Sequence, residues 1–300
     1  RHRLPLPESR WPRRRWWFYV YATESTRNVP IMKSKDLVEW TYCNTAFTNK
    51  TRPRFEPKAG IWAPDINYIN GKYVLYYAMS VWGGEQTCGI GVATANSPQG
   101  PFTDHGKMFR SNEIGVQNSI DPSLLQYEGR NYLVWGSFRG IYVIELTADG
   151  LSIMSGAKKK RIAGTAFEAV YIHKHGDYYY MFASIGSCCQ GVKSTYKVVV
   201  GRSKKVWGPY KDKTGKPMLK NGYSLVIGAN DHFVGNGHGS QIIQDDAGQD
   251  WLLYHGFSRS TPENGRILLL DQIKWDQEGW PYVEGGSPSY ETQKAPVFNN

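Results

Sequence analysis

One aromatic-rich segment recurs five times along the 300-residue chain, and this repeat constrains the fold more than any other feature. Each copy follows a polar or glycine-containing turn and ends in small residues. The copies occupy residues 15–23, 71–80, 129–137, 176–184 and 248–256. A unit that recurs at a spacing of roughly 50 to 70 residues is typical of architectures in which each repeat is one supersecondary element. We therefore expect five equivalent units.

A second short strand is predicted before four of the copies, at residues 62–68, 120–126, 167–173 and 240–244. The turn between the two strands contains Gly, often beside Asn, Asp or Lys, which is typical of a β-hairpin. Helical periodicity is nearly absent. Because a radial array of five hairpin-built sheets leaves few exposed sheet edges, we predict an all-β fold, a five-bladed β-propeller.

Length and composition fit one domain. All-β folds of this length occur as single units, and 40% hydrophobic against 21% charged residues is sufficient for a packed core. We expect one catalytic domain over residues 1–300, with an atypical Arg-rich start at 1–15. No additional C-terminal domain is expected, because fewer than twenty residues follow Tyr282.

The net charge of +10 is concentrated in two places. Residues 1–15 carry six Arg against one Glu, and four further positive charges form the run from Lys158 to Arg161. We interpret both as solvated segments, because no nucleic-acid-binding motif accompanies them. No apolar run approaches the ~20 residues of a membrane span. We expect a monomer with neither nucleic acid nor a membrane as partner.

The four cysteines are Cys43, Cys88, Cys188 and Cys189, and none has the spacing of a zinc site. Adjacent cysteines form a disulfide only with strain. We therefore expect buried, inert thiols. The chain begins with Arg1 and contains no recognisable signal peptide.

Three polar residues stand at the starts of predicted strands: Asp121, Glu168 and His238. The first strand of each propeller blade lines the central channel, so these starts are expected to converge at one end of the axis. Two carboxyl groups suit hydrolysis of a glycosidic bond, which needs a protonated acid and an ionised partner. Asp121 before Pro122 also fits a turn cap, and His238 between two glycines also fits a structural turn. Glu168 among apolar neighbours is costly to bury unless it has a function.

The motifs resemble those of glycoside hydrolase family 43, and within it the arabinanases, over nearly the whole chain. They are Trp62-Ala-Pro-Asp-Ile66, Ser119-Ile-Asp-Pro-Ser123, Trp135-Gly-Ser-Phe138, Glu168-Ala-Val-Tyr-Ile172, Ser194-Thr-Tyr-Lys-Val-Val-Val-Gly-Arg-Ser203, Gly237-His-Gly-Ser240, Leu269-Leu-Asp-Gln-Ile-Lys-Trp275 and Gly279-Trp-Pro-Tyr282. The resemblance implies an inverting hydrolase that cleaves α-1,5-L-arabinofuranosyl linkages in arabinan or arabino-oligosaccharides.

The resemblance also implies roles. Glu168 would be the general acid, and Asp121 would raise the pKa of that acid and hold it in place. His238 would lie on the axis beside a cation, calcium or sodium, or beside water alone, and no organic cofactor is expected. The residues predicted to contact substrate are Trp62, Asp65, Ser137, Phe138 and Tyr171.

The expected general base is missing. In the family it is an Asp followed by Pro shortly before the first aromatic strand, and counting back from Trp16-Trp17 places that dipeptide at Leu6-Pro7. Glu8 is the only carboxylate in residues 1–15. Either the start of the chain is altered and the enzyme is crippled, or Glu8 or another carboxylate such as Asp65 supplies the base.

Other functions compete with arabinan hydrolysis. An α-L-arabinofuranosidase or β-xylosidase would use the same fold, and a base-less protein would bind carbohydrate without turnover. A fructan-cleaving propeller is disfavoured, because its Arg-Asp-Pro is replaced by Ile120-Asp121-Pro122. The long excursion between Arg202 and Ala229 is compatible with endo or exo action. Since polymeric arabinan cannot enter a cell, a secreted or periplasmic location is favoured over the cytoplasm.

Overall fold

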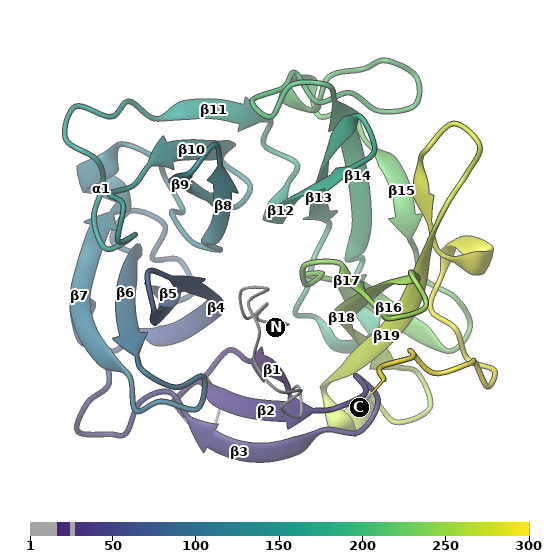
Figure 1. The fold of residues 1–300 in the computed structure, drawn as a ribbon, viewed down its shortest axis with the longest axis horizontal. Coiled ribbons are helices and arrows are strands. Elements are labelled where there is room, and N and C mark those ends of the chain that lie inside the picture. The colour runs from purple at the N-terminus through teal and green to yellow at the C-terminus, as the bar shows by residue number, and fades with distance from the viewer. Residues whose placement is uncertain (1–16, 25–27, 300) are drawn as a thin grey trace. The chain divides into compact units, whose positions relative to one another are not determined.

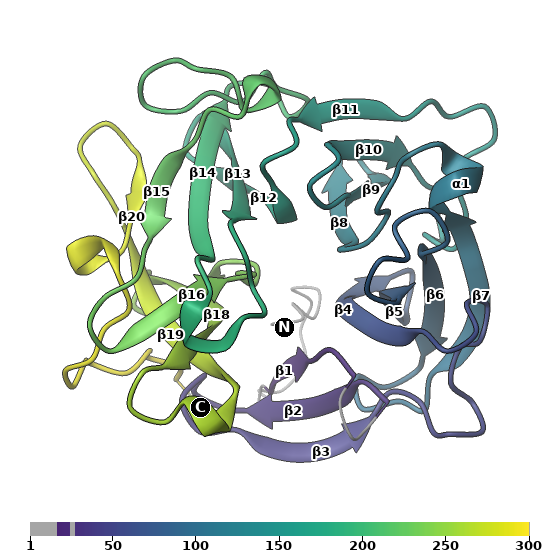
Figure 2. The same cartoon turned by 180° about the vertical axis from the view of Figure 1, so that it is seen from behind.

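The computed structural model describes residues 17–24 and 28–299, and the chain divides into two compact units. The first unit ends at Lys160, and the second runs from Arg161 to Asn299. Three antiparallel sheets lie in the first unit and two in the second (Figures 1 and 2). The prediction of an all-β, five-bladed β-propeller is confirmed.

The first unit contains three sheets, each with its strands in chain order. They are β1 (Phe18–Tyr21), β2 (Pro30–Ser34) and β3 (Thr41–Thr45); β4 (Gly60–Ile69), β5 (Lys72–Ser80), β6 (Gly89–Ala95) and β7 (Thr103–Arg110); and β8 (Ser123–Tyr127), β9 (Arg130–Trp135) and β10 (Ile141–Glu145), which belong to a four-stranded sheet with β11 (Lys160–Ala163) at its edge. The helix α1 (Ser111–Ile114) follows β7, and the boundary between the units falls within β11.

The second unit contains the remaining two sheets and four 3₁₀ turns. The sheets are β12 (Glu168–His175), β13 (Tyr178–Ile185), β14 (Lys197–Ser203) and β15 (Ser224–Ile227); and β16 (Phe233–Gly237), β18 (Asp250–Ser258), β19 (Arg266–Trp275) and β20 (Pro281–Tyr282), with β17 (Ile243–Gln244) paired to β18. The turns are η1 (Gly191–Lys193), η2 (Met218–Lys220), η3 (Pro262–Asn264) and η4 (Glu284–Gly286).

The aromatic repeats form strands because both of their faces are buried. Each of the five copies contains a strand: β1, β5, β9, β13 or β18. In β5, Tyr77 packs into a core shared with the first sheet, whereas Tyr76 packs into a core shared with the third. Successive strand residues point to opposite faces, so a strand between two sheets reads as a continuous apolar run. The buried hydroxyls bond to Gly150 and Asp104, at 2.8 and 2.6 Å.

The glycine-containing turns are tight hairpin connections. Asn70-Gly71 joins β4 to β5, and Glu128-Gly129 joins β8 to β9. Both residues of each pair have a positive φ, at 48° and 83° and at 50° and 73°. This backbone shape is that of the two-residue turns that match the twist of paired strands. The hairpins therefore form where the sequence indicated.

The fifth sheet departs from the prediction. A strand was expected at residues 240–244, but only β17 forms there, and the longer β16 precedes it. The physical reason is that the Ser240 side chain replaces a backbone acceptor of the sheet: the Ser240 N–H donates to the Leu253 carbonyl of β18 at 2.6 Å, but the Leu253 N–H donates to Ser240 Oγ, at 3.2 Å. His238 consequently lies between two strands rather than at the start of one.

Candidate active site

The first strand of three sheets carries the same β-bulge. In each bulge, an advance of three residues along the first strand is matched by an advance of only two residues along the neighbouring strand. The bulges span residues 62–65 of β4, 168–171 of β12 and 234–237 of β16. The second residue of each bulge has a positive φ: Ala63 at 36°, Ala169 at 52° and Gly235 at 67°. Bulges re-aim side chains and are frequent beside active sites. Glu168 occupies the first position of its bulge.

The third sheet repeats this pattern just before β8. The Gly136 N–H donates to the Ile120 carbonyl at 3.0 Å, Ser123 pairs with Val134, and Asp121 has a φ of 55°. Asp121 thus holds the second, positive-φ position, which Asp tolerates better than most residues. Glu168 therefore holds the first position of its bulge and Asp121 the second position of the equivalent pattern, although their sequence motifs look equivalent.

Glu168 lies in a buried polar cluster of the second unit. The residue is 8% exposed, and the Tyr196 hydroxyl donates a 2.5 Å hydrogen bond to its Oε1. The Tyr196 ring stacks on His255 with centroids 5.7 Å apart, and His255 lies 6.2 Å from the ring of His238. The structure thus brings Glu168 and His238 into one cluster through two intervening rings.

The backbone of His238 is held beside the strand pair that carries Glu168. Its N–H donates to Ser184 Oγ at 2.8 Å, and Ser184 is the partner of Glu168 in the β12–β13 register. Gly237 is required before it, because a Cβ there would stand 2.2 Å from the Tyr196 ring. The Gly-His-Gly motif therefore places a half-buried imidazole next to Tyr196.

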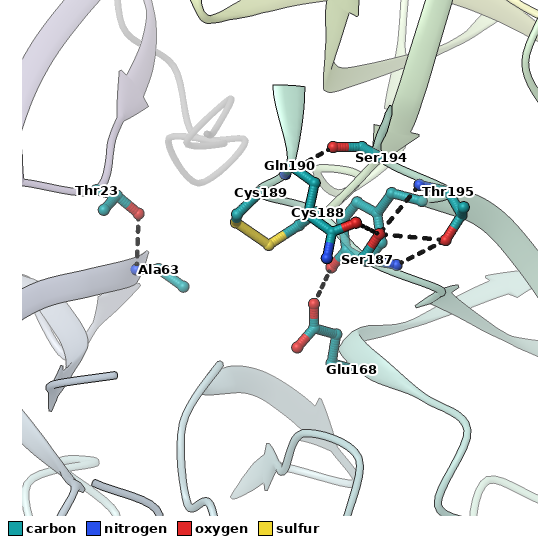
Figure 3. The surroundings of a disulfide bond; sticks show 10 residues. Thr23, Ala63, Glu168, Ser187, Cys188, Cys189, Gln190, Ser194 and Thr195 are labelled. Carbon is teal, nitrogen blue, oxygen red and sulfur yellow. Dashed lines mark hydrogen bonds between the residues drawn. A yellow bond between two sulfur atoms is a disulfide. The ribbon is translucent and has the colours of Figure 1, made fainter. Parts of the chain in front are cut away.

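A disulfide joins Cys188 to Cys189 in the loop between β13 and β14 (Figure 3). The expectation of buried, inert thiols is wrong for this pair, since Cys189 is exposed and Cys188 half-buried. The physical reason is a tight loop, in which the Thr195 and Tyr196 N–H groups donate to the Ser187 carbonyl, both at 3.1 Å. Figure 3 shows these loop residues with Glu168, which Tyr196 links to them. Cys43 and Cys88 are free thiols, and of these two Cys88 is buried as predicted, whereas Cys43 is half-buried.

Trp62 packs beside the segment of the first unit that carries Asp121. Trp62 packs against a buried cluster containing Ile120, the residue before Asp121. Asp121 is 7% exposed. The Trp62 ring also lies 5.4 Å from Trp82, which is 78% exposed and which the sequence did not single out. Aromatic faces of this kind suit sugar binding, because a ring packs on C–H groups.

Ser137 and Phe138 follow β9, and Ser137 is hydrogen-bonded to the segment that carries Asp121. The Asn118 amide donates to the carbonyl and to the Oγ of Ser137, at 3.1 and 3.0 Å. Phe138 is half-buried and has a φ of 52°. Because Asn118 lies three residues before Asp121, these bonds tie the two segments together.

Two residues predicted to contact substrate, Asp65 and Tyr171, form hydrogen bonds within the protein. Asp65 is buried, and its Oδ2 accepts from the Leu124 N–H at 2.9 Å and from Asn67 at 2.7 Å. The Tyr171 hydroxyl accepts from the Ile242 N–H at 3.0 Å and bonds to a histidine, and burial raises the pKa of this phenol far above its ordinary value. These bonds give both residues structural roles, and their contact with substrate stays a prediction.

The expected position of the general base lies outside the described residues. Leu6-Pro7 and Glu8 all fall within 1–16, so the identity of the base stays a prediction. Glu24, a described carboxylate near the start of the chain, is committed elsewhere. It pairs with Arg52 and accepts the Ile61 N–H at 2.8 Å.

The cation expected beside His238 also stays a prediction. Across residues 17–24 and 28–299, only His173, His175 and Asp250 form a group of three His, Cys, Asp or Glu side chains with ligand atoms within 4.8 Å of one another. His238 is outside that group.

Tyr196 was not predicted as a site residue, although it lies within the Ser194-Thr-Tyr motif. We expect Tyr196→Phe to lower kcat about 10-fold, because a hydrogen bond to a charged group is worth roughly 1.5 kcal/mol or more. The alkaline limb of the pH–rate profile should move to higher pH, since one donor to the ionised carboxylate is lost. Steady-state kinetics across pH measure both effects.

Tyr180→Phe is the matched control. It removes another buried hydroxyl of the second unit, which donates to the Gly279 carbonyl. It should leave the shape of the pH profile unchanged. If Tyr196→Phe kept the wild-type kcat and an unshifted pH–rate profile, Tyr196 would have no role in the active site.

Comparisons with known proteins show which family the chain resembles. The model of Glycosyl hydrolases family 43 matches residues 9–281. The extracellular exo-α-(1→5)-L-arabinofuranosidase ArbA of Cellvibrio japonicus is 37% identical over 295 residues, covering 89% of this chain and 83% of that protein. The extracellular endo-α-(1→5)-L-arabinanase 1 of Bacillus subtilis is 35% identical over 278 residues, with the same shares covered.

A solved structure shows the same fold. The α-L-arabinanase of Cellvibrio cellulosa, complexed with arabinohexaose, aligns with a TM-score of 0.81 at 34% identity, over 90% of this chain and 92% of that one. The family match covers nearly the whole chain, including the bulges that carry Asp121 and Glu168. The protein therefore belongs to the glycosyl hydrolases of family 43.

Proposed function

We propose that the protein is an inverting glycosidase that cleaves α-1,5-L-arabinofuranosyl linkages in arabinan or arabino-oligosaccharides. The observation that carries this proposal is the Glu168 carboxyl group, buried at a strand bulge and oriented by Tyr196. The relatives named above, an exo-acting and an endo-acting enzyme of α-1,5 linkages, support the choice of substrate.

Glu168 acts as the general acid in this proposal. Because Tyr196 donates to Oε1, that oxygen serves as an acceptor and the transferable proton resides on Oε2. The proton moves from Oε2 to the glycosidic oxygen as the bond to the anomeric carbon breaks. Asp121 supplies a second negative charge that keeps the acid protonated until the reaction.

Water attacks the anomeric carbon from the opposite face, which inverts its configuration. A carboxylate must take a proton from that water. Which carboxylate does so stays a prediction, and Glu8 and Asp65 are the candidates. A chain without such a base would bind arabino-oligosaccharides without turnover. The reaction on linear α-1,5-arabinan therefore tests the proposal directly.

We expect oligosaccharides or arabinose from linear α-1,5-arabinan, with the β-anomer formed first. Chromatography identifies the products and NMR of the fresh reaction identifies the anomer. Arabinose alone would assign exo action, and mixed oligomers endo action. Binding without any product at high enzyme concentration would refute the proposal in favour of a carbohydrate-binding protein. Cleavage of aryl β-xylosides or of single arabinose side chains in preference to arabinan would assign another activity of the family.

A secreted or periplasmic location fits the same proposal. The two relatives above are named extracellular, and the Cys188–Cys189 disulfide is a bond that oxidising compartments favour. No helix in the described ranges is long and apolar enough to cross a membrane. We further propose that the enzyme acts as a monomer on carbohydrate alone.

A further inference from the structure

Two histidines and a buried carboxylate meet at the end of β12 opposite to Glu168. His173 and His175 are two residues apart on one strand, so both side chains lie on the same face of the sheet. Asp250, the first residue of β18, faces them from the neighbouring sheet. The ligand atoms of all three residues lie within 4.8 Å of one another, with His175 Nδ1 3.9 Å from Asp250 Oδ2.

Other residues hold the three side chains in place. The Tyr171 hydroxyl bonds to His173 Nδ1 at 2.8 Å. Trp275 donates its indole N–H to Asp250 Oδ2 at 2.7 Å, and its ring stacks on His175 with centroids 3.7 Å apart and planes 5° apart. Metal ligands typically have such outer partners, which fix the orientation of each ring or carboxylate.

The charge of Asp250 is poorly compensated. The residue is 6% exposed, and its carboxylate oxygens accept hydrogen bonds from two neutral donors, Trp275 and Gln244. Within the described part of the chain, His175 is the only basic group within 4 Å of the carboxylate. A buried carboxylate is costly without a positive partner. A cation between Asp250 and the two imidazoles would supply that partner.

We propose that His173, His175 and Asp250 bind a divalent transition-metal ion of the zinc class. Two imidazole nitrogens and one carboxylate oxygen are ligands that suit zinc, and water completes four-coordination. Tetrahedral ligands at about 2.0 to 2.1 Å from zinc lie about 3.4 Å apart. The 3.9 Å pair would therefore close by about half an ångström on binding.

The site is separate from the proposed chemistry. Six residues of β12 lie between Glu168 and His175, which corresponds to roughly 20 Å of strand. Metal binding would instead link β12 to β18, and so join the two sheets of the second unit. The expected consequence is higher stability of this unit, and it does not depend on the glycosidase proposal.

The test uses the full chain after treatment with a chelator and desalting. Titration with ZnCl₂ by calorimetry should show one ion per chain, with a Kd in the micromolar range or tighter. Thermal unfolding should shift upward by about 5 °C at a hundredfold excess over Kd. Co²⁺ should give the visible absorption bands of a four-coordinate ion.

Two variants locate the ion. His175→Ala removes a ligand whose side chain is 38% exposed, so folding should be retained, and zinc affinity should fall at least about 10-fold. Asp250→Asn should weaken binding similarly while keeping the side-chain shape. His105→Ala is the matched control, because His105 is an exposed histidine of the first unit, and zinc binding should be unchanged.

Three results would overturn the proposal. The first is the absence of saturable zinc binding by the stripped chain. The second is wild-type affinity in both His175→Ala and Asp250→Asn. The third is an equal loss of affinity in His105→Ala, which would indicate adventitious binding at the surface. Circular dichroism of each variant confirms that the folded state is being compared.

Discussion

Glu168→Gln should lower kcat on linear α-1,5-arabinan by about 1,000-fold, because general acid catalysis contributes roughly 10²- to 10⁴-fold. Gln keeps the size of the side chain and can still accept from Tyr196, but it has no proton to transfer to the leaving oxygen. The change removes chemistry rather than structure, so KM and the unfolding temperature should alter little. Steady-state kinetics and a thermal scan make the measurement.

A substrate with a good leaving group tests the cause of that loss. In a dinitrophenyl glycoside the leaving group is a dinitrophenolate, which departs without being protonated. Glu168→Gln should therefore retain much more of its activity on such a substrate than on arabinan. Glu113→Gln is the control, since Glu113 is a surface carboxylate bonded to Lys107. Equal losses on both substrates would mean that Glu168 is not the acid, and unchanged turnover of arabinan would mean the same.

Asp121→Asn should lower kcat on arabinan by about 100-fold or more, because the variant loses the charge that the proposal assigns to keeping the acid protonated. Asn is the appropriate replacement, since it accepts the left-handed backbone that Asp121 adopts at a φ of 55°. The fold should therefore persist. Kinetics, with circular dichroism as the check on folding, measure the effect.

Asp121→Val separates the backbone requirement from the charge. A β-branched residue at a positive φ is strained, so this variant should lose stability as well as activity. Asp121→Asn should lose activity alone. If Asp121→Asn instead turned over arabinan at the wild-type rate, Asp121 would be a structural turn residue, the alternative that its position before Pro122 leaves open.

The repeating sheets could be predicted because their signal is redundant. Each aromatic copy is buried on both faces, as Tyr76 and Tyr77 show, and each hairpin carries its own glycine. A chain with five such units offers few other folds. The strand β16 was missed because its sequence, Phe-Val-Gly-Asn-Gly, is too rich in glycine to resemble a strand.

The site was only partly predictable, for physical reasons. Glu168, Asp121 and His238 stood out through their unusual local sequence contexts. Their positions within the bulges could not be predicted, because a shift of one residue in a bulge does not change the sequence motif. Tyr196 and Trp82 gain their roles from a hydrogen bond and from 78% exposure, which are properties of the folded chain. The Cys188–Cys189 bond depends on how a loop folds back on itself.

The shared bulge also indicates where new side chains can be grafted. Its first position accepts Trp62, Glu168 or Val234, whose shapes and polarities have little in common, so the backbone there does not select a residue type. The second position holds Ala63, Ala169, Gly235 or Asp121, because its φ excludes bulky branched residues. An engineer who wishes to install another functional group in this scaffold should substitute the first position and leave the second as it is.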